Sequence, residues 1–171
     1  ALPIGGCQRF QDYAVEKNRR DLLARSYCMM GTTYYDFSQY DKAVTFLYKS
    51  LPIAEEMKLE LLQSKIYNYL GIINSDQGNS KKAIYFFRKT YTIAVKLNDL
   101  SQQFTSANNI GVDYNNIKVP ILGIYYITIC EGIAKKYKAY NYLPSIYGNK
   151  MESYMGLNDA IKAKEQLDSV Y

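Results

Sequence analysis

Hydrophobic residues in the middle of the chain recur with the period of an α-helix. In residues 61–77 the apolar stripe consists of Leu62, Ile66, Tyr69, Leu70 and Ile73. The polar segment "QGNSKK" then interrupts it, and a second stripe follows at Ala83, Ile84, Phe87, Tyr91, Ile93, Ala94 and Leu97. This spacing predicts two amphipathic helices joined by a short turn. Gly78 suits the end of the first helix, and Asn79 or Ser80 suits the start of the second.

The same pattern returns every 40 residues. One column contains Gly31, Gly71 and Gly111, and a second contains Ala43, Ala83 and Gly123. A third column extends through four copies at Ala14, Ala54, Ala94 and Ala134, within "YAVEK", "IAEEM", "IAVKL" and "IAKKY". Three columns with one period predict an array of repeated helix pairs.

A fourth copy is expected with a shorter connection. Gly148 and Ala160 preserve the twelve-residue spacing, but Gly148 follows Gly111 by 37 residues. We therefore expect a deletion of three residues between the helices, within "KAYNYLP".

Glycines inside helices need a physical reason, because glycine costs about 1 kcal/mol there relative to alanine. Antiparallel helices approach closely only where the facing side chains are small. We expect Gly71 to face Ala83 in this way, with aromatic side chains such as Tyr34 and Phe87 beside such contacts. Pro120 is expected in the first turn of a helix, where no N–H donor is needed.

These motifs resemble the tetratricopeptide repeat. The segments are "YCMMGTTY" with "KAVTFL", "YNYLGIIN" with "KAIYFF", "ANNIGVDY" with "LGIYYI", and the degenerate "PSIYGNKM" with "DAIKAKEQ". Asn74, Gly123 and Lys164 depart from the pattern, and the 40-residue period is similar to that of longer repeats in bacterial signalling and regulatory proteins. The resemblance implies an all-α, right-handed superhelical solenoid of antiparallel helix pairs.

The repeat register predicts the domain organisation. Residues 1–23 would be the last helix of a truncated preceding repeat, followed by repeats at 24–63, 64–103 and 104–140 and a degenerate repeat at 141–171. We expect a fragment of a longer protein, whose unpaired ends, around Phe10 and Tyr13 for example, associate weakly with other copies.

Composition narrows the chemistry. The chain has 171 residues, 48% of them apolar, and no apolar run reaches the roughly 18 residues that span a membrane. Its net charge of +5 comes from dispersed lysines, without a motif for reading nucleic acid. There is no histidine, and Cys7, Cys28 and Cys130 are too widely spaced for a zinc site. We expect no enzyme activity, no metal and no cofactor.

Three classes of function were compared: enzyme, binding scaffold and self-assembling structural module. The resemblance favours a protein- or peptide-binding scaffold, the sensory or interaction region of a larger bacterial regulator. The alternative is a structural module that assembles through the solenoid ends. The first ten residues lack the pattern of an intact signal peptide, and the alternative is a signal that has been removed. A soluble protein is expected because no apolar run spans a membrane, with a cytoplasmic location slightly favoured over a periplasmic one.

The family resemblance implies that the first helix of each pair lines a concave groove. The groove residues proposed on this basis are Arg25, Tyr35, Lys65, Asn68, Asn108, Asn115 and Asn149. A side-chain amide both donates and accepts hydrogen bonds, so a ladder of asparagines suits an extended peptide backbone. Arg25 or Lys65 would then select an acidic group. Cys28 and Thr32 occupy places where chaperone-tail binders carry a clamp, which excludes that specificity. Alternatively, these asparagines are merely solvated.

Overall fold

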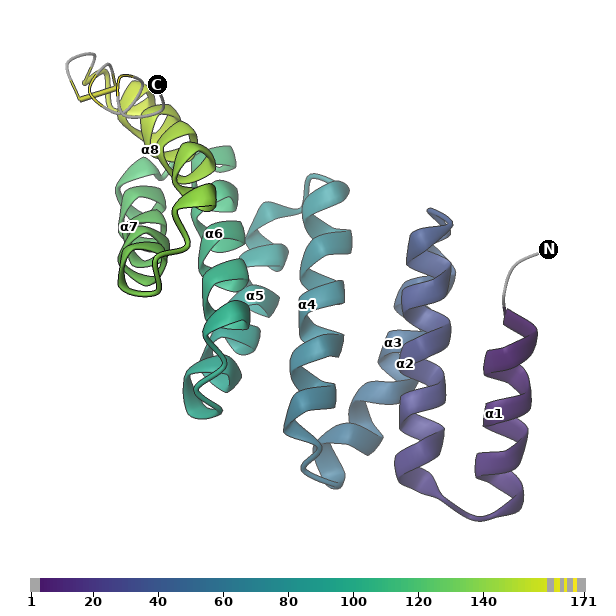
Figure 1. Cartoon of the computed structure of the whole chain (residues 1–171). Coiled ribbons are helices and arrows are strands. Elements are labelled where there is room, and N and C mark those ends of the chain that lie inside the picture. Colours follow the sequence, from purple (N-terminus) through teal and green to yellow (C-terminus); the bar gives the residue numbers. More distant parts are fainter. Residues whose placement is uncertain (1–3, 160–161, 164, 166–167, 169–171) are drawn as a thin grey trace. The chain divides into compact units, whose positions relative to one another are not determined.

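The computed structural model describes residues 4–159, 162–163, 165 and 168, and within them it is entirely helical (Figure 1). The α-helices are α1 (Ile4–Glu16), α2 (Arg20–Asp36), α3 (Tyr40–Glu56), α4 (Glu60–Asp76), α5 (Ser80–Lys96), α6 (Leu100–Asn116), α7 (Pro120–Lys136) and α8 (Leu143–Gly156). A short 3-10 helix, η1 (Tyr140–Tyr142), precedes α8. The chain forms two compact units, Ala1–Ile73 and Asn74–Tyr171. Within each unit consecutive helices run antiparallel, which confirms the predicted all-α fold of helix pairs.

The turns between helices repeat every 20 residues, half the period seen in the sequence. Each turn contains one residue with positive φ: Asn18, Ser38, Lys58, Gly78, Asn98, Lys118, Lys138 and Asn158. At the end of α6, Lys118 N donates to Asn115 O (2.9 Å) and Val119 N donates to Tyr114 O (2.9 Å). This pair of bonds is the Schellman motif, which satisfies the last carbonyls of a helix. The same pair of hydrogen bonds ends each of the described α-helices at the same position of the 20-residue repeat. Three residues then reverse the chain before the next helix begins.

Glycine at these turn positions is expected to stabilise the protein. Lys118 adopts φ 61° and Lys138 adopts φ 57°, a conformation that costs a side chain about 1–2 kcal/mol and costs glycine far less. We expect Lys118→Gly to raise the free energy of unfolding by about 0.5–1 kcal/mol in urea titrations. Asn98→Gly is the matched control and should gain less, because asparagine tolerates this conformation. A loss of stability in Lys118→Gly would contradict this account.

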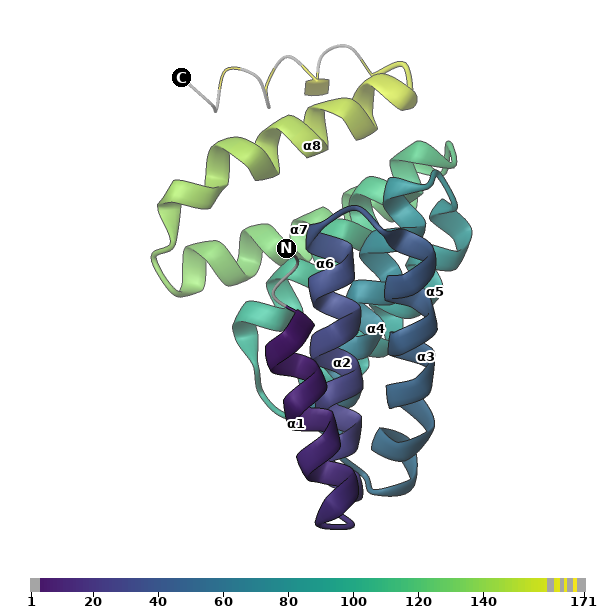
Figure 2. The same ribbon diagram turned by 90° about the vertical axis from the view of Figure 1, so that its right-hand side faces the viewer.

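Two glycines of the predicted column, Gly31 and Gly111, lie where two helices touch. A Cβ atom added to Gly31 of α2 would stand 2.8 Å from Leu47 Cγ and 3.1 Å from the carbonyl oxygen of Ala43, both in α3. A Cβ atom added to Gly111 would stand 2.6 Å from Ile127 Cγ1 and 3.2 Å from the carbonyl oxygen of Gly123. Figure 2 shows α2 beside α3 in the first unit. Close contact therefore explains glycine at these two members of the column.

Aromatic rings fill the space beside these contacts. In the first unit Tyr34 stacks on Phe46 with ring centroids 5.3 Å apart. In the second unit Tyr114 stacks on Tyr126 with centroids 5.8 Å apart. The two pairs are separated by exactly two sequence repeats, so the same packing arrangement is used in both units, with Tyr34 beside the close contact as expected.

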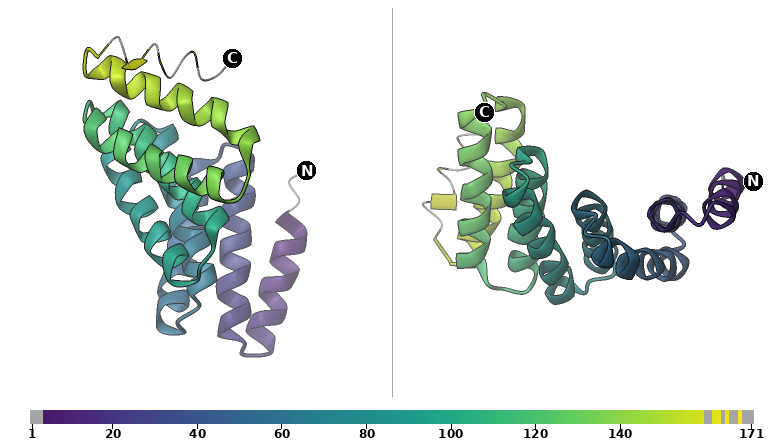
Figure 3. Two further views of the ribbon diagram at one scale, coloured as in Figure 1. Left: turned by 60° about the vertical axis from the view of Figure 1, so that its left-hand side comes forward. Right: turned by 90° about the horizontal axis from the view of Figure 1, so that it is seen from below.

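The predicted deletion before the fourth copy is wrong. The positive-φ residues Lys118, Lys138 and Asn158 keep the 20-residue spacing, so no residues are missing. The shorter α8 instead begins late, because η1 replaces its first turn. In Figure 3 α8 is the yellow-green helix nearest the C-terminus. Pro144 has no N–H to donate to the carbonyl of Tyr140, and its ring would crowd that carbonyl, so it is favoured only in the first turn of an α-helix.

The fourth copy consequently has a different register from the predicted one. A Cβ atom added to Gly148 would meet nothing within 4 Å, so this glycine does not belong to the close-contact column. Met151 occupies the position 40 residues after Gly111, and the buried Ala163 lies 40 residues after Gly123. Ala160, the partner expected for Gly148, lies outside the described residues.

Candidate functional site

Two unpaired cations flank a buried thiol in the first unit. Arg25 and Cys28 lie on α2, and Lys65 lies on α4; the Arg25 and Lys65 side chains are exposed. Burial raises the pKa of Cys28 to about 11, and the positive charges of Lys65 and Arg25 oppose that rise. Both cations therefore lie near the same thiol, and neither forms a salt bridge with another residue that the structure describes.

An aromatic pair lies on the same two helices. The ring of Tyr35 meets the ring of Tyr69 edge-on, with centroids 5.5 Å apart. Tyr35 also contacts the ring of Tyr40, with centroids 6.0 Å apart. Burial raises the pKa of Tyr69, and the negative charge of the Asp36 carboxylate raises it further. Tyr69 was not among the predicted site residues, although it lies four residues after Lys65 and therefore on the same side of the helix.

Asn68 completes this surface, which we call the α2–α4 face and define as Arg25, Cys28, Tyr35, Asp36, Lys65, Asn68 and Tyr69. Asn68 is half-buried, and its Oδ1 atom is buried without a hydrogen-bond partner in the described chain. A buried amide oxygen left unpaired costs about 1–3 kcal/mol. If the half-buried side chain turned this oxygen toward solvent, it would be able to accept a hydrogen bond from a partner's backbone N–H. Arg25, Tyr35, Lys65 and Asn68 are therefore the predicted site residues that the structure brings together in the first unit.

The cysteine at this face is expected to be unreactive. Burial raises the pKa of Cys28 to about 11 and that of Cys130 to about 12. Since only the thiolate reacts, less than about one thousandth of either thiol would be reactive at pH 8. We expect iodoacetamide at pH 8 to leave both peptides unlabelled in the native chain and to label both in urea, as measured by mass spectrometry. Equal labelling rates in the two conditions would show that the thiols are not buried.

The other three predicted site residues form an internal network in the second unit. Asn149 Nδ2 of α8 donates to Asn108 Oδ1 of α6 (3.0 Å). Asn115 Nδ2 of α6 donates to the carbonyl of Asn149 (3.3 Å), and Ser153 Oγ donates to Asn115 Oδ1 (2.8 Å). Asn115 and Ser153 are buried. These amides hold α8 against α6, so their hydrogen-bonding groups are largely used within the fold.

The network explains why Gly123 stands where the repeat pattern has alanine. A Cβ atom added to Gly123 would overlap Asn115 Oδ1 and approach Asn115 Cγ to 3.1 Å. The amide of Asn115 occupies the space that an alanine methyl fills in the other copies. Gly123 and Asn115 are therefore a compensating pair, which aligned repeats alone did not reveal.

The described residues also bear on whether the chain has a metal site or a membrane-spanning helix. Among them there is no group of three or more histidine, cysteine, aspartate or glutamate side chains placed to hold a metal ion. None of the helices described is long and apolar enough to cross a membrane.

Comparisons with known proteins identify the repeat. A tetratricopeptide repeat model matches residues 23–57, which cover most of α2 and all of α3. No curated protein matches the chain in sequence. The TPR domain of Arabidopsis FLU is similar in structure, with a TM-score of 0.63 and 19% identity over 65% of this chain and 93% of that domain.

A second solved structure covers more of the chain. BtubC (BKLC) from P. vanneervenii has a TM-score of 0.78 and 21% identity, over 88% of this chain and 63% of BtubC. This chain therefore spans less than two thirds of BtubC. Residues 23–57 thus form a tetratricopeptide repeat, and the chain has the solenoid fold of tetratricopeptide repeat proteins.

Proposed function

We propose that the chain is a protein-interaction scaffold whose α2–α4 face binds an acidic segment of a partner protein. The observation that supports this most directly is the pair of exposed cations, Arg25 and Lys65, without an ion-pair partner in the described residues. Arg20 and Arg19, by contrast, are already paired, with Glu56 at 2.6 Å and with Asp21 at 2.8 Å. The two free cations would pair with carboxylates, and the guanidinium of Arg25 can do so through two hydrogen bonds.

The rest of the face has complementary chemistry. Asn68 would accept a hydrogen bond from a backbone N–H through its unpaired Oδ1. The edge-on rings of Tyr35 and Tyr69 would pack against an apolar side chain of the bound segment. This arrangement selects a short extended segment with acidic and apolar residues and gives no basis for nucleic-acid recognition.

The proposed biological role is a sensory or interaction region within a larger bacterial regulator. A binding scaffold acts by holding its partner, and another part of the regulator would convert this binding into a regulatory response. A tetratricopeptide fold supports protein partners in general, and the regulator role rests on the resemblance of the longer repeats.

A phage-displayed library of random 12-residue peptides provides a test that needs no knowledge of the partner. We expect selection on the purified chain to enrich peptides that contain aspartate or glutamate. Synthetic copies should bind at least tenfold more weakly to the Arg25→Glu, Lys65→Glu double variant in isothermal titration calorimetry. Arg9→Glu with Lys58→Glu is the matched control, since it makes the same charge change at exposed positions of the same unit.

Two results would overturn the proposal. One is the absence of any enriched peptide, which would favour assembly through the solenoid ends. The other is equal affinity of the enriched peptides for the parent and for the Arg25→Glu, Lys65→Glu variant, which would move binding away from the α2–α4 face.

A further inference from the structure

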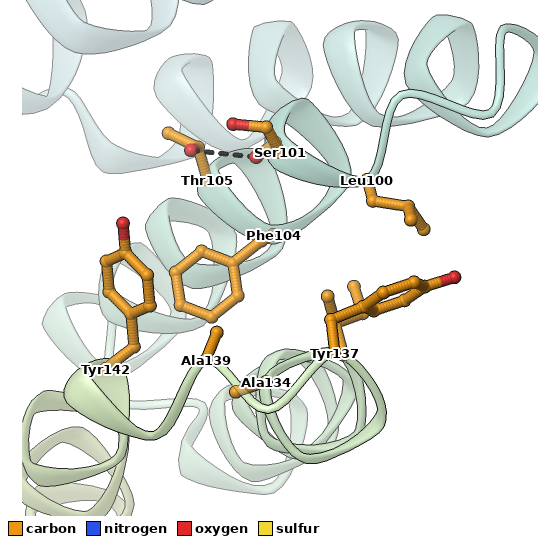
Figure 4. A pocket seen from close by; sticks show the side chains of 9 residues that line it. Leu100, Ser101, Phe104, Thr105, Ala134, Tyr137, Ala139 and Tyr142 are labelled. Atoms are coloured by element: carbon orange, nitrogen blue, oxygen red, sulfur yellow. Dashed lines mark hydrogen bonds between the residues drawn. The ribbon is translucent and has the colours of Figure 1, made fainter.

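A small apolar pocket opens in the second unit between α6, the end of α7 and η1. Figure 4 shows Phe104 and Tyr142 on one side, Leu100 and Tyr137 on the other, and Ala134 with Ala139 beneath. Its volume is about 260 Å³. Drug-sized ligands and cofactors occupy pockets of roughly 300–1,000 Å³, so this pocket suits a single large side chain rather than a cofactor.

A side-chain hydrogen bond that recurs at the ends of two earlier helices has no equivalent among the described residues at the end of α7, beside this pocket. In the first unit Gln63 Nε2 donates to the carbonyl of Ala54 (2.8 Å), and in the second Gln103 Nε2 donates to the carbonyl of Ala94 (3.1 Å). The residue at the next equivalent position is Leu143, which has no amide to donate. The amide hydrogen bond to the end of the preceding helix is therefore absent here, and Leu143 instead packs against the core cluster that contains Ala134.

Aromatic residues of η1 form the open side of the pocket. The ring of Tyr142 packs against the ring of Phe104, with centroids 5.1 Å apart. Tyr142 and Tyr137 are each 49% exposed although they line an apolar surface. Large exposed rings around a concave apolar surface are typical of sites that bind a partner.

Two lysines lie next to lining residues at the end of α7. Lys136 Nζ lies 5.3 Å from the centre of the Tyr137 ring, and Lys138 lies between the lining residues Tyr137 and Ala139. Both side chains are exposed. Lys135 is already paired with Glu131, so the free positive charge at this end of α7 comes from Lys136 and Lys138.

The acid next to this pocket in the sequence is engaged as a helix cap. Asp99 precedes Leu100, and its carboxylate accepts a hydrogen bond from Gln102 N (3.0 Å) as the cap of α6. A carboxylate in that position is stabilised by the positive end of the helix dipole. The lysine side of the pocket therefore remains complementary to an acidic ligand.

We propose that this pocket holds one large apolar side chain of a partner segment whose neighbouring residues are acidic. The inference rests on the proposed function as a protein-interaction scaffold and adds a second contact site with its own specificity. The apolar side chain would contact Leu100, Phe104 and Ile133, while adjacent carboxylates would pair with Lys136 and Lys138. The charge complementarity of the rim is what selects a peptide over a second copy of this basic chain.

The test uses a fixed probe, the peptide acetyl-Gly-Glu-Glu-Leu-Glu-Glu-Gly-amide, and its counterpart with alanine in place of leucine. Binding to the full chain is followed through the ¹³C-labelled methyl signals of Leu100 and Ile133. We expect the leucine peptide to shift both signals in a saturable manner and to bind at least fivefold more tightly than the alanine peptide. Ser101→Trp, which fills the pocket from an exposed position of its lining, should weaken binding at least tenfold.

Matched variants separate the pocket from general charge and surface effects. Lys136→Glu with Lys138→Glu should weaken binding at least tenfold, whereas Lys81→Glu with Lys82→Glu, at exposed positions of α5, should change it less than Lys136→Glu with Lys138→Glu does. Thr128→Trp, at an exposed position of α7 outside the lining, should leave affinity within twofold of the parent.

Each alternative outcome would overturn the pocket proposal, and each would point to a different explanation. Shifts confined to residues of the α2–α4 face would reject the pocket but retain the proposed function. Parent-like affinity of Ser101→Trp, or no methyl shift at 1 mM peptide, would also reject the pocket. Methyl shifts that depend on protein concentration without peptide would assign it to a second copy instead.

Discussion

Replacing Gly123 with alanine is expected to destabilise the chain by about 2–4 kcal/mol, although alanine is the residue that the repeat pattern favours there. The added methyl group would overlap Asn115 Oδ1 and approach the carbonyl of Gly111 to 3.2 Å. To make room, Asn115 would have to release Ser153 and the carbonyl of Asn149, leaving buried polar groups unpaired. Urea unfolding followed by circular dichroism measures the effect.

A double-mutant cycle isolates the cause. Asn115→Ala alone should cost about 1–3 kcal/mol through lost hydrogen bonds. Combined with Gly123→Ala it should cost clearly less than the sum of the two single changes, because the small side chain at position 115 leaves room for the new methyl group. If Gly123→Ala instead stabilises the chain by about 1 kcal/mol, as helix propensity alone predicts, the compensating pair does not exist.

The second large effect is a contrast between two helical glycines. Gly111→Ala should destabilise the chain by about 2 kcal/mol, because the new Cβ atom would stand 2.6 Å from the fully buried Ile127. Gly148→Ala should stabilise it by about 0.5–1 kcal/mol, because nothing lies within 4 Å of the new atom and alanine favours helix. The same unfolding assay compares them directly.

This contrast also tests the register of the fourth copy. If Gly148 belonged to the close-contact column, as its twelve-residue spacing to Ala160 suggested, its alanine variant would lose stability like Gly111→Ala. A gain in Gly148→Ala together with a loss in Gly111→Ala supports the register with Met151 and Ala163. Two losses of similar size would restore the deletion that the sequence predicted.

The repeated helix pairs could be predicted from the sequence because packing recurs with the chain. Close helix contact requires glycine at both Gly31 and Gly111, which lie two repeats apart, so the requirement appears as a column in the sequence. The 20-residue period of the turns was not visible, because positive φ is adopted by asparagine, serine, lysine and glycine alike. Backbone hydrogen bonds fix these turns whatever the side chain, so the residue types at the turn positions do not reveal the period.

The candidate site was only partly predictable, for a different physical reason. Asparagine can bond a ligand or another helix equally well, and the sequence gives no information about which. The structure assigns Asn115 and Asn149 to contacts between α6 and α8, while Asn68 retains an unpaired oxygen. The compensation between Gly123 and Asn115 joins residues in different helices, and one sequence without aligned relatives does not reveal such a pair.

The central claim is that the α2–α4 face, rather than the asparagines of the second unit, binds the partner segment. The most direct measurement is an amide and side-chain NMR titration of the full chain with a selected acidic peptide. The account predicts saturable shifts at Arg25, Lys65, Asn68 and Tyr69, with the Nδ2 signal of Asn115 unchanged. Shifts at Asn115 and Asn149 without any at Arg25 or Lys65 would contradict it.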